Sequence, residues 1–152
     1  MASQRPFGIS PTKRSQTLLV VDDDSYFLAW LTTYLESEGF TVLKALDAHD
    51  ALVRCQETGT IQLLLTDLLL PPNTLKLQTG RPIWQRMHGQ ELARQIEARH
   101  SGIKVVFMTG HSEQELNALQ IFREGRPLLR KPFRHDTLLW TVNAVLEGRP
   151  TE

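Results

Sequence analysis

The sequence predicts an α/β domain in which five parallel strands form one doubly wound sheet flanked by five helices. Two short apolar runs carry this prediction, Leu18-Leu19-Val20-Val21 and Leu63-Leu64-Leu65-Thr66-Asp67, and each leads into acidic residues. Continuous apolar runs of this length are typical of strands buried on both faces, as in a parallel sheet. The rest of the chain alternates strand-like runs with segments of helical periodicity, as right-handed β-α-β crossovers require.

The first half of the chain supplies three strands and two helices. Strands are predicted over residues 17–21, 40–45 and 61–66. After the first strand, large side chains recur at helical spacing until Gly39, where the helix should stop. We expect its stripe, aromatic residues included, to face the core: Tyr26, Phe27, Trp30, Leu31, Tyr34 and Leu35. A second helix should end near Gly59 and carries at core spacing Ala48, Ala51, Leu52 and Cys55.

The second half supplies the remaining elements. Strands are predicted over residues 103–108 and 127–130, and helices from Gly89, over 113–122, and after Asp136, which fits an N-cap. The last helix should end at Gly148 and has at core spacing Leu138, Leu139, Val142, Val145 and Leu146. Trp140 falls off that apolar face, where it would either mark a dimer or partner surface or pack partly buried.

One domain is expected, over residues 17–148. Residues 1–16 contain Pro6, Gly8, Pro11 and three serines without a sustained period, which predicts a flexible lead-in, and residues 149–152 form a tail. After Pro71-Pro72 no clear period returns until Gly89, so an unusually long loop is expected at about 72–88.

Composition excludes several classes of protein. The 17 basic residues balance the 17 acidic ones, so no overall field favours nucleic acid or an anionic membrane. The single cysteine, Cys55, excludes an internal disulfide and a Cys-based zinc cluster, and its helical position predicts a packed thiol. No apolar run approaches the ~20 residues that span a bilayer, and no signal-peptide core follows Met1. We therefore expect a cytoplasmic protein.

Functional groups follow four of the predicted strands: Asp22 and Asp23 after the first, Asp67 after the third, Thr109 after the fourth and Lys131 after the fifth. Open α/β sheets bind ligands beyond the carboxyl ends of their strands, so these groups should face one edge. Carboxylates packed together repel, which raises their pKa values or recruits a metal. Magnesium fits an all-oxygen site that retains several waters, and manganese would fit as well.

A hard cation, a hydroxyl and a lysine around one carboxylate are what phosphoryl transfer onto that carboxylate requires. Asp67 would then be the nucleophile. In this assignment Asp23 and Asp67 bind the metal directly, and Asp22 holds a metal-bound water. Thr109 donates to one phosphoryl oxygen and Lys131 pairs with another.

These residues resemble the receiver domain of two-component response regulators, over roughly residues 17–147. The resemblance rests on five segments at agreeing spacings: Leu19-Val20-Val21-Asp22-Asp23-Asp24, Thr66-Asp67 with Pro71, Gly89-Gln90-Glu91-Leu92, Val105-Val106-Phe107-Met108-Thr109-Gly110 and Arg130-Lys131-Pro132-Phe133. It implies a flavodoxin-like fold with strand order 2-1-3-4-5, and a cis peptide bond at Lys131-Pro132. It further implies that Asp67 is the phosphoacceptor and that magnesium is held by Asp22, Asp23, Asp67 and the backbone carbonyl of Leu69.

The resemblance also implies partners. A histidine kinase or a histidine phosphotransfer protein would supply the phosphoryl group, and a downstream protein target would respond to it. Such a domain is a switch rather than an enzyme, since it catalyses only its own phosphorylation and dephosphorylation. Because only Thr151 and Glu152 follow Pro150, we expect no DNA-binding domain in this chain, and no membrane contact. A homodimer through the fourth and fifth helices remains open.

The sequence departs from the family pattern at three places. The stretch at 72–88 is longer than the family's and is either a tolerated surface excursion or a recognition element or lid. Leu128 stands where an aromatic reporter is common, which puts the usual coupling to Thr109 in doubt. Leu69 and His111 occupy positions that modulate hydrolysis in the family; an apolar Leu69 predicts slow dephosphorylation, and His111 is expected to face solvent.

Two other function classes compete with a phosphoacceptor. A pseudo-receiver that only binds partners is disfavoured by the complete set of acidic pair, threonine and lysine. A magnesium-dependent phosphatase of related topology would need an acid/base carboxylate two residues after the nucleophile, where the sequence has Leu69.

Overall fold

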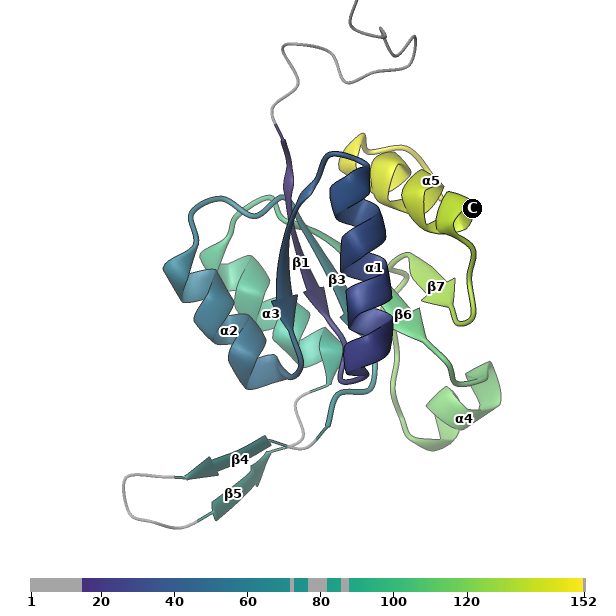
Figure 1. Ribbon diagram of the computed structural model, residues 1–152. Helices are drawn as coiled ribbons and strands as arrows, with labels where there is room; N and C mark the ends of the chain where they lie inside the picture. Colours follow the sequence, from purple (N-terminus) through teal and green to yellow (C-terminus); the bar gives the residue numbers. More distant parts are fainter. Residues whose placement is uncertain (1–14, 72, 77–81, 86–87, 152) are drawn as a thin grey trace, which may run out of the picture.

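The computed structural model describes residues 15–71, 73–76, 82–85 and 88–151, and at its centre is a five-stranded parallel sheet (Figure 1). The sheet consists of β1 (Thr17–Val21), β2 (Thr41–Ala45), β3 (Leu63–Asp67), β6 (Lys104–Thr109) and β7 (Leu128–Arg130). The helices are α1 (Ser25–Ser37), α2 (Ala48–Glu57), α3 (Gly89–Arg99), α4 (Glu113–Ala118) and α5 (His135–Leu146). The strand order β2-β1-β3-β6-β7 corresponds to 2-1-3-4-5 within this sheet. The predicted fold class and strand order are confirmed.

The sheet is covered by helices on both faces. In Figure 1, α2 and α3 lie over one face and α1 and α5 over the other. Every residue of the central strand β3 is buried, and its side chains alternate between the two layers: Leu64 joins the α2/α3 core, whereas Leu63 and Leu65 join the α1/α5 core. Each leucine buried in this way contributes about 2 kcal/mol relative to an exposed one. The two apolar runs of the sequence are therefore strands that are buried on both faces of the sheet.

The predicted core stripe of α1 is confirmed at Leu31 and Leu35 and wrong at Tyr26 and Trp30. Tyr26 is 89% exposed and Trp30 is 37% exposed. Phe27 and Tyr34 are half-buried. The stripe that faces the sheet lies beside the aromatic one and consists of Leu28, Leu31, Thr32 and Leu35. The aliphatic side chains fill the flat surface of the sheet, so the larger rings are left at the margin of the helix.

Helix α4 is shorter than predicted, because it ends at Ala118 rather than at Phe122. Gln120 adopts the left-handed conformation, with φ 58°, and the N–H of Ile121 bonds to the carbonyl of Leu116. This turn brings Ile121 into the core and leaves Leu119 and Phe122 exposed. Ile121 is therefore buried because the chain leaves the helix before it, and helical periodicity in the sequence cannot predict such a turn.

Helix α5 begins earlier than predicted. Its N-cap is Arg134, in an extended conformation and without a side-chain cap bond, so the prediction of an Asp136 cap was wrong. Asp136 instead lies in the first turn, where its carboxylate accepts the N–H of Thr137 at 2.8 Å. Its negative charge there interacts favourably with the positive end of the helix dipole. Trp140 is 48% exposed, and the guanidinium of Arg149 lies 6.0 Å from its ring centroid.

The predicted loop at about 72–88 lies partly outside the described residues, and its described part contains two strands. These are β4 (Asn73–Lys76) and β5 (Pro82–Gln85), which pair with each other in antiparallel register. Among the described strands they form a separate two-stranded sheet, and Figure 1 shows this hairpin extending away from the layered body. At its base, the N–H of Gly89 donates to the carbonyl of Leu68 at 2.9 Å. The excursion is therefore closed by a backbone hydrogen bond.

Other expectations fall at the ends of the chain and in its interior. Residues 1–14 of the expected lead-in lie outside the described residues, while the Ser15 hydroxyl donates to the carbonyl of Gly39 at 3.0 Å. The Cys55 thiol is buried, as predicted, and burial raises its pKa. Within the described residues, none of the helices has the length and apolar character to cross a bilayer.

Candidate functional site

Three carboxylates meet where β1 and β3 end. Asp22 follows β1 directly, and Asp67 is the last residue of β3; the two strands are adjacent, with Val21 opposite Thr66. The carboxylate oxygens of Asp22, Asp23 and Asp67 lie within 4.8 Å of one another. Asp22 and Asp67 are buried, whereas Asp23 is exposed. Oxygen donors of this kind at this spacing suit a hard divalent cation.

Lys131 bridges two of these carboxylates. Its Nζ lies 2.6 Å from Oδ2 of Asp22 and 2.9 Å from Oδ2 of Asp67. The backbone holds the residue in place, since the N–H of Lys131 donates to the carbonyl of Thr109 at 2.8 Å. The Lys131-Pro132 peptide bond is cis, as the resemblance implied. The Lys131 ammonium, directly after β7, thus lies within hydrogen-bond distance of two carboxylates of the cluster.

Burial shapes the protonation of this pair. Burial raises the pKa of the Asp67 carboxyl above its ordinary value, and the negative charge of Asp22 raises it further. The hydrogen bonds from Lys131 and from the N–H of Leu69 lower this pKa, but the net shift is upward. Burial would by itself lower the pKa of Lys131, but its hydrogen bonds to Asp22 and Asp67 outweigh that effect and raise it. The lysine therefore stays charged beside a carboxylate that is costly to bury.

The third aspartate of the acidic run has a different role. Asp24 is the N-cap of α1, and its carboxylate accepts the N–H groups of Tyr26 and Phe27 at 3.0 and 3.1 Å. Its own N–H donates to Oδ1 of Asp22 at 2.9 Å. Asp24 therefore starts the helix and orients Asp22, and it is not a member of the carboxylate cluster.

Thr109 lies at the end of β6, the strand next to β3, and is buried. Its hydroxyl oxygen accepts the N–H of His111 at 3.0 Å, which leaves the hydroxyl proton available for donation. Among the described residues no hydrogen bond joins Thr109 to Asp67. His111 is partly exposed and pairs through Nδ1 with Glu115 at 3.0 Å.

An open pocket of about 560 Å3 lies over the cluster. Acidic, basic and apolar groups line it together: Asp22, Asp23, Asp24, Asp67, Leu69, Leu70, Pro71, Gly110, His111, Leu119 and Lys131. Leu69 presents an apolar side chain next to Asp67 and donates its N–H to Oδ1 of that carboxylate at 3.2 Å. The resemblance assigned the backbone carbonyl of Leu69 to a metal, and this residue does border the site.

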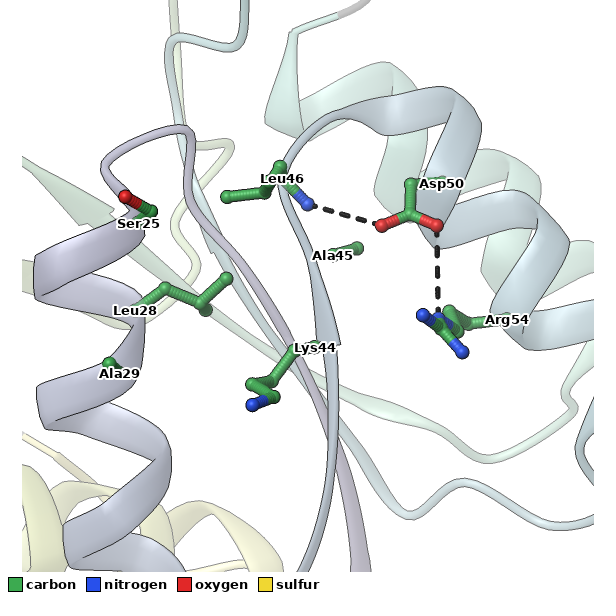
Figure 2. A pocket seen from close by; sticks show the side chains of 8 residues that line it. All are labelled: Ser25, Leu28, Ala29, Lys44, Ala45, Leu46, Asp50 and Arg54. Carbon is green, nitrogen blue, oxygen red and sulfur yellow. Dashed lines mark hydrogen bonds and ion pairs between the residues drawn. The ribbon is translucent and has the colours of Figure 1, made fainter.

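A smaller pocket, of about 250 Å3, lies between α1, β2 and α2 (Figure 2). Its carboxylate, Asp50, accepts the N–H of Leu46 at 3.4 Å with one oxygen, and its other oxygen lies 3.7 Å from Nε of Arg54. Both oxygens are thus engaged locally, and no second carboxylate lines the pocket. It lacks the convergent acidic groups found at Asp67, which makes the Asp67 pocket the candidate site.

Phe27 contacts the site although its sequence pattern indicated only a core role. The Nζ of Lys131 lies 4.5 Å from the centroid of its ring. The two residues are more than a hundred positions apart in the chain, so no local spacing in the sequence indicates this contact.

The doubly wound five-stranded sheet with strand order 2-1-3-4-5 matches the CheY-like flavodoxin fold. Among solved structures, the receiver domain protein of Clostridium thermocellum matches with a TM-score of 0.67 and 26% identity, covering 88% of this chain and 95% of that one. A CheY-like receiver domain protein of Methanospirillum hungatei matches with a TM-score of 0.68, also at 26% identity and with the same coverage.

Curated relatives agree with the structures. Protein PilH of Pseudomonas aeruginosa is 33% identical over 136 residues, which cover 86% of this chain and 98% of PilH. Sensor kinase CckA of Brucella abortus is 27% identical over 135 residues, but the match spans only 13% of that protein. No protein-family model matches the chain. The chain belongs to the receiver-domain family of two-component response regulators.

Proposed function

We propose that this chain is a phosphoacceptor: it takes a phosphoryl group from a phosphohistidine onto Asp67 with Mg2+, and the aspartyl phosphate then switches its contacts with other proteins. The observation that supports this most directly is the Lys131 ammonium, which lies within hydrogen-bond distance of both Asp22 and Asp67 at the mouth of an open pocket. A carboxylate, a cation and room for a phosphoryl group are found together there.

Each residue has a role in the transfer. A carboxylate oxygen of Asp67 attacks phosphorus as the phosphorus–nitrogen bond of the donor breaks, and the electron pair leaves on the imidazole, which then takes a proton. Lys131 already touches Asp67 and pairs with a phosphoryl oxygen, which lowers the energy of the charge that develops there. The Thr109 hydroxyl, whose oxygen accepts the N–H of His111, donates a hydrogen bond to another phosphoryl oxygen. Leu69 and Leu70 line the same pocket as the acceptor.

The residues of the cluster fit a divalent cation. Asp22, Asp23 and Asp67 provide three carboxylates whose ligand atoms lie within 4.8 Å of one another, and the backbone carbonyl of Leu69 would complete the protein ligands of Mg2+ or Mn2+. A bound cation of this kind neutralises charge on phosphoryl oxygens. Removing one of these carboxylates should therefore weaken metal binding and phosphoryl uptake together.

The proposal extends to organisation and partners. Residues 17–148 form the receiver unit, and the hairpin is its insertion. A histidine kinase or histidine phosphotransfer protein would be the donor, and the receiver itself would act as a switch and not as an enzyme with a separate substrate. The half-exposed Trp140 on α5 supports the α4/α5 face as the surface for a homodimer or a downstream target.

Incubation with acetyl phosphate and Mg2+, followed by mass measurement, tests the central claim. The wild-type protein should gain one phosphoryl group, and Asp67→Asn should gain none. No added mass on the wild type would favour the pseudo-receiver scaffold. The phosphatase alternative is disfavoured because the position two residues after Asp67 carries the apolar side chain of Leu69.

A further inference from the structure

We infer that Phe27 is a positioning residue for Lys131: its aromatic ring holds the lysine ammonium against Asp22 and Asp67. This inference rests on the proposed function for its kinetic consequence but not for the contact itself. The ammonium lies 4.5 Å from the ring centroid of Phe27, and its two carboxylate partners lie at 2.6 and 2.9 Å. The group is thus held by two anions and by the face of one ring.

A lysine needs such a support. Its side chain has four rotatable bonds, so it loses rotamer entropy when it is fixed in one position. The Lys131 side chain is only 20% exposed, so its contact with the ring takes place largely away from water. Attraction between a cation and an aromatic ring is strongest under those conditions, because water does not compete for the charge.

The ring is itself fixed from two directions. The N–H of Phe27 donates to the Asp24 carboxylate at 3.1 Å, which sets the first turn of α1. The ring meets Phe133 edge-on with centroids 5.7 Å apart, and stacks on Trp30 at 5.5 Å. Phe133 follows Lys131 by two residues, so the same ring contacts both the lysine side chain and the segment that carries it.

Leu128 has no ring that could report on the site from β7, whereas Phe27 places one in direct contact with the lysine from α1.

Fluorinated phenylalanines at position 27 provide the kinetic test, because successive fluorine atoms weaken the attraction of the ring for a cation while nearly preserving its shape. The rate of phosphoryl uptake from acetyl phosphate should fall stepwise along the mono-, di- and trifluoro series, by about two- to fivefold in total. The same series at Phe40, which is half-buried against the same core, is the matched control and should leave the rate unchanged. A flat or rising rate along the Phe27 series would overturn the inference.

A second measurement does not depend on phosphorylation. In the wild-type protein the ring current of Phe27 should shift the side-chain methylene protons of Lys131 upfield in the NMR spectrum, and Phe27→Leu should abolish that shift while Tyr26→Leu retains it. Unshifted Lys131 protons in the wild type would overturn the contact. Failure of the wild type to gain phosphoryl mass would instead contradict the proposed function, and the NMR measurement would still decide whether Phe27 positions Lys131.

Discussion

A Cβ atom on Gly89 would lie 2.3 Å from the carbonyl oxygen of Asp67, closer than any side chain can approach a backbone atom. The first residue of α3 is thus packed directly against the peptide group of the proposed phosphoacceptor. Because the opposing atom is backbone, the strand end itself would have to move to admit a methyl group.

Gly89→Ala should therefore destabilise the fold by about 1 to 3 kcal/mol and slow phosphoryl uptake at Asp67. Denaturant titration and uptake from acetyl phosphate measure the two effects. Gly59→Ala is the matched control, since a Cβ there meets nothing within 4 Å, and its stability should change by less than about 0.5 kcal/mol. Equal stability of the two variants would contradict the steric argument.

Asp67→Asn should raise the free energy of unfolding at neutral pH. Burial raises the pKa of the Asp67 carboxyl, so the folded state binds this proton more tightly than the unfolded state. A raised carboxyl pKa favours folding while the group is protonated, and that advantage is lost as the pH rises through the folded pKa. The gain from the substitution should consequently shrink toward about pH 4.

Urea titrations of wild type and variant at both pH values measure this difference. Asp23→Asn, at an exposed member of the same cluster, should change the unfolding free energy little at either pH. A less stable Asp67→Asn at neutral pH would show that the Lys131 bond outweighs the cost of burial.

Magnesium should raise the thermal stability of the protein, because it binds the folded cluster and not the unfolded chain. At ten times its Kd the gain would be about 1.4 kcal/mol, and chelation should reverse it. Asp23→Asn should lose most of this gain, whereas Asp24→Asn should keep it, since the Asp24 carboxylate caps α1 instead. Calorimetry with and without MgCl2 decides between these outcomes, and an Asp24→Asn variant that no longer responds would contradict the assignment.

Replacing residues 73–85 with a short Gly/Ser linker should leave the fold intact, because β4 and β5 pair only with each other among the described strands and the Gly89–Leu68 bond closes the base. If the hairpin is a recognition element or lid, phosphoryl lifetime or donor choice should change. Circular dichroism, phosphoryl decay and transfer from alternative donors provide the readouts. Unchanged lifetime and donor choice would identify the hairpin as a tolerated surface excursion.

Leu69→Asn should accelerate loss of the phosphoryl group by roughly tenfold, since a polar side chain beside Asp67 can orient the attacking water. Leu119→Asn, at another leucine that lines the same pocket, is the control and should leave the lifetime unchanged. Decay of the phosphorylated mass over time measures both variants. An already short lifetime in the wild type, or no change in Leu69→Asn, would count against an inhibitory Leu69.

The sheet was predictable because burial on both faces leaves a strong trace in sequence. Runs such as Leu63-Leu64-Leu65 have few alternatives to a central strand, and the acidic residues after them mark the edge where strands end. The meeting of Asp22 with Asp67 follows from topology once the strands are known to be adjacent.

The predictions were wrong where local backbone conformation or side-chain packing sets the structure. The left-handed Gln120 ends α4 early, and neither its residue type nor the apolar period around it indicates this conformation. Tyr26 and Trp30 recur at the helical spacing of α1 yet lie outside its buried face, because only Leu28, Leu31, Thr32 and Leu35 of this helix are buried. The Phe27–Lys131 contact depends on how α1 and the end of β7 pack together, which periodicity within either element does not specify.

The closed base of the hairpin has a practical use. Leu68 and Gly89 remain hydrogen-bonded at 2.9 Å while the chain between them leaves the body and returns, so the length of that excursion is uncoupled from the position of Asp67. A fluorescent protein or an affinity tag grafted in place of residues 73–85 would leave the hydrogen-bonded base, and with it Asp67, in position. The receiver could then be converted into a sensor whose optical signal follows its own chemical state, with the graft site chosen by the fold and not by trial.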